Sequence, residues 1–159
     1  MKKPLLPLAA VLCSLLPLCC LSEHRAAAAE ASVKESVLAL LNMQKEAWNR
    51  GDLNTFMTGY WQSPAISYTC AGNEVWGYNA IRDRYQKRYG QNRESMGKLA
   101  FSDTRILELG KANALCIGHW HLIRDGKEPL DGTFSLVLQR TGKGWKILHD
   151  HTSLYKKES

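Results

Sequence analysis

Four apolar-rich stretches in the C-terminal half of the chain constrain its fold more than any other feature. They cover residues 98–109, 112–124, 132–140 and 145–154, and only short glycine-containing turns separate them. Turns of this kind join antiparallel neighbours. The pattern therefore predicts a four-stranded meander, and a long twisted meander curls into an open half-barrel with one concave face.

The N-terminal half predicts helices and one hairpin. Ser32-Val33-Lys34-Glu35 is a capping box, and apolar residues at helical spacing follow it for about 17 residues until Gly51. The other expected elements are a short helix from Asp52 to Tyr60, a hairpin over residues 65–76 and a helix over residues 79–89. Because helices and strands are segregated, the fold class is α+β, and 159 residues suit one domain.

Residues 1–31 are typical of an export signal. Lys2 and Lys3 precede an uncharged apolar run from Leu5 to Leu21, and a polar break and a row of alanines follow it. This order of a positive start, an apolar middle and small residues is that of a secretory signal peptide. We therefore expect an exported protein, located in the periplasm or secreted.

The exact processing of this leader is open. Cleavage after Ala29 or Ala31 fits the small-residue rule and leaves residues 32–159 as the mature domain. Lipidation at Cys19 or Cys20 is one alternative, and retention of the leader as a membrane anchor is another. Contact with a membrane is expected only in those two cases.

A basic cluster stands out in the charge pattern. The net charge of +6 falls to +5 without residues 1–31, and six bases lie between Arg82 and Lys98 against two acidic residues. Such a cluster attracts nucleic acid or an anionic surface in some proteins. Here the aromatic residues between the bases recur at helical spacing. We interpret the cluster as a solvated helix face and expect no nucleic-acid partner.

Common cofactor and metal motifs are absent from the sequence. It has no phosphate-binding glycine loop, no HExxH and no CxxC, so we expect no cofactor and no metal. Only Cys70 and Cys116 follow the leader, each within an expected apolar strand. They form either a disulfide, as an oxidising compartment allows, or two buried thiols.

Two short segments concentrate imidazoles, Gly118-His119-Trp120-His121 and His149-Asp150-His151. Side chains alternate along a strand, so each histidine pair shares one face. If both pairs faced one cavity, four imidazoles could ligate a metal. Otherwise each histidine is half-buried and hydrogen-bonded, and Asp150 with an imidazole supplies the groups for acid–base catalysis.

The order of elements and three motifs together resemble the nuclear transport factor 2-like superfamily. The motifs are Ala47-Trp48-Asn49-Arg50-Gly51-Asp52, Gly118-His119-Trp120 and the segment from Gly144 to Ser153. Within it, the chain is most similar to SnoaL-like bacterial proteins and to the association domain of calcium/calmodulin-dependent protein kinase II. Members include isomerases, cyclases, dehydratases and non-catalytic binding or oligomerisation modules, so the resemblance implies a fold more than an activity.

The resemblance covers residues 33–154, and we assign residues 32–159 to one domain of this type. It implies a cone-shaped, curved antiparallel sheet wrapped around helices, with a central pocket and the last strand beside the first. That strand order puts Cys70 and Cys116 about 14 Å apart at the usual strand spacing. A disulfide needs a much shorter separation, so the resemblance argues against one.

The kinase association domain also implies which side chains face the pocket. Carried over position by position, the inward residues are His119, His121, Thr133, Ser135, Val137, Leu148, Asp150 and Thr152. His149 and His151 then face the convex side of the sheet, through which relatives often dimerise. Opposite orientations of the two histidine pairs exclude a four-histidine metal site. Two arginines of that relative's pocket correspond to His121 and Thr152, so its carboxylate-binding arginines are missing here.

The steroid isomerase branch implies a carboxylate base in the first strand, with a phenol and a protonated acid for the oxyanion. Residues 65–70 contain no carboxylate, so the base position is empty. Asp150 is the only acid in the expected interior, and it either acts as a base or orients His121.

We therefore expect an exported homodimer, joined through the convex sheet face, that binds a small amphipathic molecule. The expected ligand-binding residues are Trp48, Tyr60, Tyr68, Tyr85, His119, Ser135 and Thr152. One alternative is an isomerase, cyclase or dehydratase in which His121 and Asp150 transfer the proton. Another is a purely oligomeric scaffold, in which side chains fill the pocket and the convex sheet is apolar.

Overall fold

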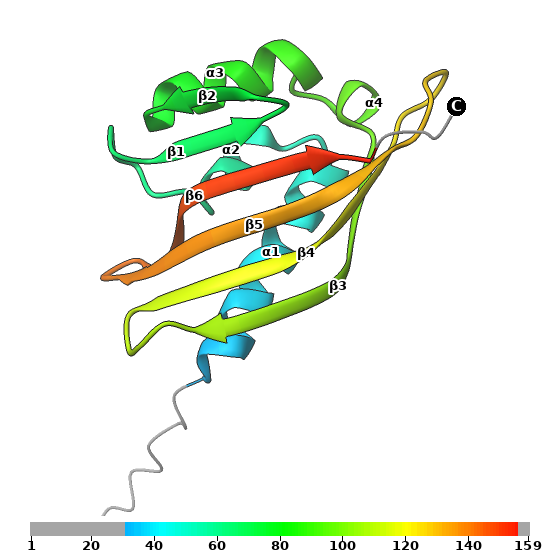
Figure 1. Cartoon of the computed structure of the whole chain (residues 1–159). Helices are drawn as coiled ribbons and strands as arrows, with labels where there is room; N and C mark the ends of the chain where they lie inside the picture. The colour runs from blue at the N-terminus through cyan, green and yellow to red at the C-terminus, as the bar shows by residue number, and fades with distance from the viewer. Residues whose placement is uncertain (1–30, 156–159) are drawn as a thin grey trace, which may run out of the picture. The chain divides into compact units, whose positions relative to one another are not determined.

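The computed structural model describes residues 31–155, and the export signal expected over residues 1–31 lies outside this part except for Ala31. The described elements are α1 (Val33–Asn49), α2 (Leu53–Met57), β1 (Ser67–Cys70), β2 (Asn73–Trp76), α3 (Tyr78–Tyr89), α4 (Arg93–Met96), β3 (Lys98–Glu108), β4 (Asn113–Ile123), β5 (Leu130–Thr141) and β6 (Gly144–Leu154) (Figure 1). All elements but α4 were expected from the sequence, with similar bounds.

The strands form one curved sheet in the order β2-β1-β6-β5-β4-β3. Strands β3 to β6 are the expected antiparallel meander. The last strand lies beside the first as expected, and this β1–β6 pair is parallel. Figure 1 shows α1 and α2 against one face of the sheet and α3 beside β1 and β2. The α+β fold with a curved, unclosed sheet around helices is therefore confirmed.

Helix α1 begins where the capping box predicts. The backbone nitrogen of Glu35 donates to the Ser32 hydroxyl at 3.2 Å, and the Ser32 nitrogen donates to the Glu35 carboxylate at 2.9 Å. These hydrogen bonds lower the pKa of Glu35. One face of the helix is buried against the sheet, and its residues are Val37, Leu40, Leu41, Gln44, Ala47 and Trp48.

The motif at the end of α1 fastens the helix to the start of β3. The Trp48 indole nitrogen donates to the Met96 carbonyl at 3.0 Å. The Asn49 amide donates to the Leu99 carbonyl at 3.1 Å and accepts from the Leu99 nitrogen at 2.7 Å. These hydrogen bonds therefore hold the end of α1, and the Trp48 side chain, in a fixed position against β3.

The two cysteines of the domain are buried free thiols. Cys70 is on β1 and Cys116 on β4, and both β6 and β5 lie between these strands. Burial raises the pKa of the Cys116 thiol to about 12. Across residues 31–155, no helix is long and apolar enough to span a membrane, and no group of His, Cys, Asp or Glu side chains is placed to hold a metal ion.

Candidate functional site

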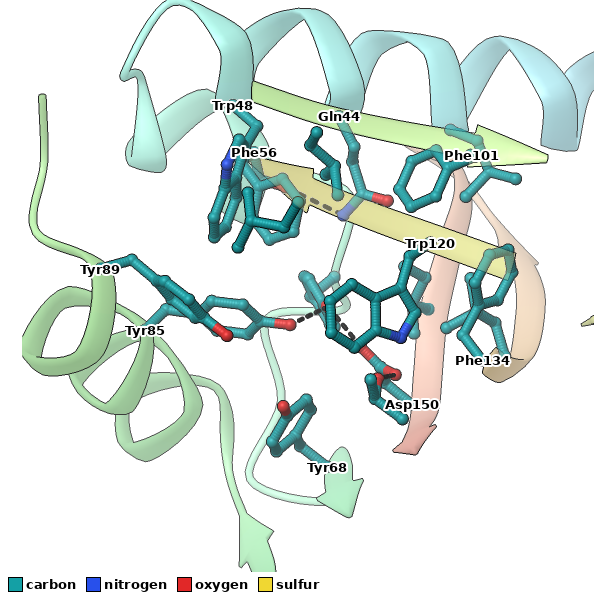
Figure 2. A pocket seen from close by; sticks show the side chains of 17 residues that line it. Gln44, Trp48, Phe56, Tyr68, Tyr85, Tyr89, Phe101, Trp120, Phe134 and Asp150 are labelled. Carbon is teal, nitrogen blue, oxygen red and sulfur yellow. Dashed lines mark hydrogen bonds between the residues drawn. The ribbon is translucent and has the colours of Figure 1, made fainter. Parts of the chain in front are cut away.

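A cavity of about 80 Å³ lies between the inner face of the sheet and helices α1, α2 and α3. It exceeds the space that a single water molecule needs. Most of its walls are apolar, and nine of the 17 lining residues are aromatic (Figure 2). The lining residues are Leu41, Gln44, Trp48, Phe56, Tyr60, Tyr68, Tyr85, Tyr89, Leu99, Phe101, Trp120, Leu122, Phe134, Leu136, Ile147, Asp150 and Thr152.

One side of the cavity is a cluster of aromatic rings from α1, α2, α3 and β1 that contact one another edge to face. Trp48 lies 5.0 Å from Phe56 and 4.9 Å from Tyr89, measured between ring centroids. Tyr85 lies 5.6 Å from Tyr68 in the same kind of contact. Each such pair contributes about 0.5–1.5 kcal/mol beyond its buried area. The wall is therefore preorganised for a flat apolar body.

The polar end of the cavity is built on Asp150, whose exposed fraction is 4%. The Tyr60 hydroxyl donates to one carboxylate oxygen at 2.6 Å, and the Thr152 hydroxyl donates to the other at 2.9 Å. The Tyr60 and Tyr85 hydroxyl oxygens are 3.1 Å apart. Because the single Tyr60 proton goes to Asp150, Tyr85 is the donor to Tyr60. A directed chain therefore runs from Tyr85 through Tyr60 to Asp150 (Figure 2).

Burial dominates the electrostatics of this chain. It raises the pKa of Asp150, although the hydrogen bonds from Tyr60 and Thr152 act in the opposite direction. Burial first, and then the Asp150 charge, raises the pKa of Tyr60 well above its ordinary value. The pKa of Tyr85 is also raised well above ordinary, first by burial and then by Tyr60. Both phenols therefore stay protonated at neutral pH.

Six of the nine residues expected at the site line the cavity, and they come from five different parts of the fold. They are Trp48 on α1, Tyr60 after α2, Tyr68 on β1, Tyr85 on α3, and Asp150 and Thr152 on β6. Several other lining residues were not predicted from the sequence, among them Gln44, Tyr89, Phe101 and Trp120. The open cavity does not have the filled interior that a purely oligomeric scaffold would require.

The other three expected residues, His119, His121 and Ser135, lie on the opposite, outer face of the sheet. In β4 the buried or inward positions are Cys116, Gly118, Trp120 and Leu122, which alternate with the histidines. In β5 they are Phe134, Leu136 and Leu138, which alternate with Thr133, Ser135 and Val137. The inward assignment of His119, His121, Thr133, Ser135 and Val137 is therefore wrong, because the facing of these strands is the reverse of what the resemblance implied.

The expected pair of His121 and Asp150 does not form. His121 Nδ1 hydrogen-bonds to the Asp131 carboxylate, its cross-strand neighbour in β5. His119 Nδ1 lies 3.3 Å from the Asp103 carboxylate on β3. Both histidines are thus occupied on the outer face by carboxylates of neighbouring strands.

A bulge in β6 sets the inner face of that strand. Val137 pairs with His149 but Leu138 pairs with Ile147, so Leu148 is the extra residue. Ile147 is therefore the buried residue that lines the cavity, and the inward assignment of Leu148 is wrong. Beyond the bulge, Asp150 and Thr152 line the cavity as expected.

The register of β6 also sets the orientation of the two remaining histidines, His149 and His151. His151 is exposed beside Asp150, and the His149 ring hydrogen-bonds to the Ser67 hydroxyl at 2.7 Å. Neither residue lines the cavity, as expected.

Gly118, in the motif Gly118-His119-Trp120, is a glycine because the inner face of β4 has no room for a side chain at this position. It pairs with Phe134 across β4 and β5, and a Cβ at this position would lie 2.6 Å from the Phe134 ring. A residue without a side chain lets the ring reach the cavity wall. Such a close ring-to-glycine contact places Gly118, and with it Trp120, on the inner side of β4.

The family of the chain follows from a match over most of its length. The model of the SnoaL-like domain matches residues 37–156. The chain belongs to this family. The SnoaL-like domain here includes every described strand and all of the cavity-lining residues.

Solved structures agree with this assignment. A nuclear transport factor 2-like protein of unknown function from Shewanella oneidensis is 35% identical, with a TM-score of 0.71, over 76% of this chain and 98% of that one. A nuclear transport factor 2-like superfamily protein from Salmonella enterica is 21% identical, with a TM-score of 0.64, over 79% and 93%. A candidate ketosteroid isomerase from Parabacteroides distasonis is 15% identical, with a TM-score of 0.61, over 79% and 89%, a likeness of fold alone. No curated protein matches the chain.

Proposed function

We propose that this SnoaL-like domain binds a compact, largely apolar small molecule in the cavity, with one polar group of the molecule against Asp150. A single observation carries this proposal: nine aromatic side chains enclose one buried carboxyl that has its own chain of hydroxyl donors. Apolar cavities with a few convergent polar groups are the usual form of a ligand site.

The direction of the hydrogen bonds defines what that polar group is. The hydroxyl protons of Tyr60, Tyr85 and Thr152 are all used within the chain that ends at Asp150. The carboxylate retains unused lone pairs, since each of its oxygens can accept more than one hydrogen bond. A ligand is therefore best matched by a hydroxyl or amine hydrogen that it donates at this end of the cavity.

A titration with two small probes tests this function. We expect 4-ethylphenol to bind the wild-type domain, as measured by calorimetry, and 4-ethylanisole, which has no hydrogen to donate, to bind about tenfold more weakly. Leu136→Phe adds bulk to the cavity wall beside Asp150, the cross-strand neighbour of Leu136 on β6, and should weaken the binding of both probes by at least about fivefold.

Val137→Phe is the matched control, because it adds the same ring at the adjacent position of β5, where the side chain points to the outer face of the sheet. It should leave both affinities unchanged, and a thermal melt of each variant establishes that it folds. Failure of both probes to bind, or equal affinities in Leu136→Phe and wild type, would contradict a ligand site in this cavity.

A second candidate is a proton-transfer enzyme, and the observation that favours it is the placement of Asp150. A buried carboxyl that lines a cavity, and whose pKa is raised by burial, is a stronger base than an ordinary carboxylate and suits proton abstraction. The name of the Parabacteroides neighbour suggests isomerisation of an unsaturated ketone. In that reaction Asp150 would take a proton from the carbon beside the carbonyl and return it further along the conjugated system, and Tyr60 would position the carboxylate.

This candidate is tested with a β,γ-unsaturated ketone followed by the absorbance of the conjugated product. Turnover in the wild type should disappear in Asp150→Asn and remain in His121→Ala, since His121 lies outside the cavity. Absence of turnover in the wild type, or turnover that persists in Asp150→Asn, would refute the proton-transfer function and would not affect the binding function.

Export and dimerisation remain part of the proposal. The composition of residues 1–31 supports export to the periplasm or beyond the cell. Ile117, with an exposed fraction of 39% on the outer face of β4, supports a homodimer through the convex sheet. N-terminal sequencing of the mature protein tests the first point. Light scattering of wild type and Ile117→Glu tests the second, with a dimer expected only for the wild type.

A further inference from the structure

Gln44 is a buried polar side chain on the face of α1 that otherwise buries apolar and aromatic residues. Its exposed fraction is 2%, and it lines the cavity. A buried amide lowers stability unless its polar atoms are hydrogen-bonded, and a leucine or methionine at this position would have an equal preference for helix. Both ends of the amide therefore need a partner.

The nitrogen end of the amide is held by the turn after α2. Gln44 Nε2 donates to the Phe56 carbonyl at 3.1 Å. The side chain also packs on Gly59, where a Cβ would lie 2.6 Å from Nε2. Because only the nitrogen can donate to a carbonyl, this bond fixes the orientation of the amide. Figure 2 shows the nitrogen on the dashed bond and the oxygen turned away from it, towards Phe101.

The oxygen end has no hydrogen-bond partner among residues 31–155, where the bond from Nε2 is the only one that the Gln44 side chain makes. In this part of the chain, Arg124 Nε is the one unpartnered side-chain atom that is fully enclosed by protein. The Gln44 oxygen is therefore open to the cavity that its residue lines.

The fold itself does not account for this amide. The Phe56 carbonyl also accepts from the Gly59 nitrogen at 3.2 Å, so it has a partner without Gln44. A buried acceptor that lacks a donor lowers stability, and nearly all such groups in proteins are paired. The Gln44 oxygen is thus an acceptor for which the described part of the chain supplies no donor.

Gln44 and Asp150 offer the cavity the same chemistry from two different elements. Gln44 is on α1 and Asp150 is on β6, and these elements lie on different sides of the cavity. An amide oxygen only accepts hydrogen bonds, and the Asp150 carboxylate retains unused lone pairs. The matching ligand is therefore an apolar body that carries two hydrogen-bond donors.

We propose that Gln44 selects the ligand by accepting a second hydrogen bond from it, so that the ligand is a compact, neutral aromatic diol. This inference rests on the cavity function proposed above. One hydroxyl donates to Asp150, the ring packs against the aromatic walls, and the second hydroxyl donates to Gln44 Oε1. An ether or carbonyl oxygen in place of the second hydroxyl would set two acceptors against each other.

The test compares three phenols that have the same number of heavy atoms and differ only in a two-atom substituent. They are hydroxymethylphenol, which has a second donor, methoxyphenol, which has only an acceptor there, and ethylphenol, which has neither. Each is titrated into the domain by calorimetry as its 3- and 4-substituted isomers, because the distance between the two polar groups differs between them. For the isomer that binds more tightly, we expect the alcohol to bind about tenfold more tightly than the ether.

Gln44→Met assigns this preference to the amide, since methionine has a similar length and no strong acceptor. The preference for the alcohol over the ether should fall below about twofold, while the affinity for ethylphenol should change less than about twofold. Leu41→Met is the matched control, because it changes another cavity-lining side chain on the same helix without removing a polar group. It should retain the preference, and a thermal melt of each variant establishes that it folds.

Equal binding of alcohol and ether by the wild type overturns the inference without the use of any variant, and binding of ethylphenol then leaves the cavity function intact. A preference that persists in Gln44→Met also overturns it, because the second hydroxyl then has another partner. The same holds for a preference that is lost in Leu41→Met, because the effect is then one of cavity shape. Failure of all three phenols to bind refutes both the inference and the function on which it rests.

Discussion

Replacing Asp150 with asparagine should remove a loss of stability that the wild-type domain suffers as the pH rises. Asp150 is almost fully buried, and burial raises its pKa in the folded state. In the unfolded chain the same carboxyl has an ordinary pKa of about 3.9. Between these two pKa values the folded state binds one proton more than the unfolded state, so the free energy of unfolding falls with rising pH.

The magnitude follows from the slope of this linkage. One proton of difference corresponds to about 1.4 kcal/mol per pH unit. Below the unfolded pKa both states are protonated and the penalty is absent. It grows from about pH 4 until the pH passes the raised pKa of the folded state, and above that it is constant. Glu35 and Asp52, whose pKa values are lowered, have the opposite effect in acid, but they are common to both proteins and cancel.

Urea unfolding of wild type and Asp150→Asn at several pH values between 3 and 8 measures this difference. We expect the stability of wild type minus that of the variant to fall as the pH rises from about 4 and then to level off. Asp125→Asn removes an exposed carboxyl from the β4–β5 turn and should give a flat difference. A flat or rising difference for Asp150→Asn would refute the placement of this carboxyl in a poorly solvated interior.

Three further outcomes follow from the structure. Gly51→Ala should lower the free energy of unfolding by at least about 2 kcal/mol, because Gly51 has φ +79° and a Cβ there would lie 2.2 Å from the backbone. Gly142→Ala is the control: no atom lies near its Cβ position, so the free energy of unfolding should not change. His121→Ala should change the affinity for 4-ethylphenol less than twofold, and a tenfold loss would place His121 at the site. In residues 32–159, Cys70 and Cys116 should resist a thiol reagent when folded and both react after unfolding; fewer than two reactive thiols would indicate a disulfide.

The fold was accessible from the sequence because its signals are local and mutually consistent. The capping box at Ser32, the glycine after α1 and the glycine turns between strands each define an element without reference to the rest of the chain. Helix α4 was not expected, since it has only four residues from Arg93 to Met96. A helix of one turn leaves no periodic pattern, and its position depends on the contacts that Trp48 makes with it.

The facing of the central strands was not accessible from the resemblance, because a shift of one residue reverses every side chain of a strand. The alternation in β5 carries the missing signal: Phe134, Leu136 and Leu138 alternate with Thr133 and Ser135. Apolar residues at every second position mark the buried face, and pairing with β4 then turns Trp120 inward and His121 outward. The bulge at Leu148 leaves no comparable trace in the sequence.

The basic cluster shows a different limit of sequence reasoning. Lys87 and Arg88 are exposed on α3, in keeping with a solvated helix face. Arg84, from the same cluster, lies over the ring of a cavity residue. Helical spacing identifies the side of a helix on which a base lies, but the element packed next to that side depends on the tertiary fold. Only the structure brings Arg84 to Tyr68 and Arg124 to Tyr89.

A crystal structure of residues 32–159 with 4-ethylphenol is the most direct test of the central claim, that the aromatic cavity is the ligand site. We expect the ring of the compound between Trp48, Tyr85 and Trp120, with its hydroxyl within hydrogen-bond distance of the Asp150 carboxylate. Density for the compound only on the outer face, beside His119 and His121, or a cavity closed by its own side chains, would contradict it.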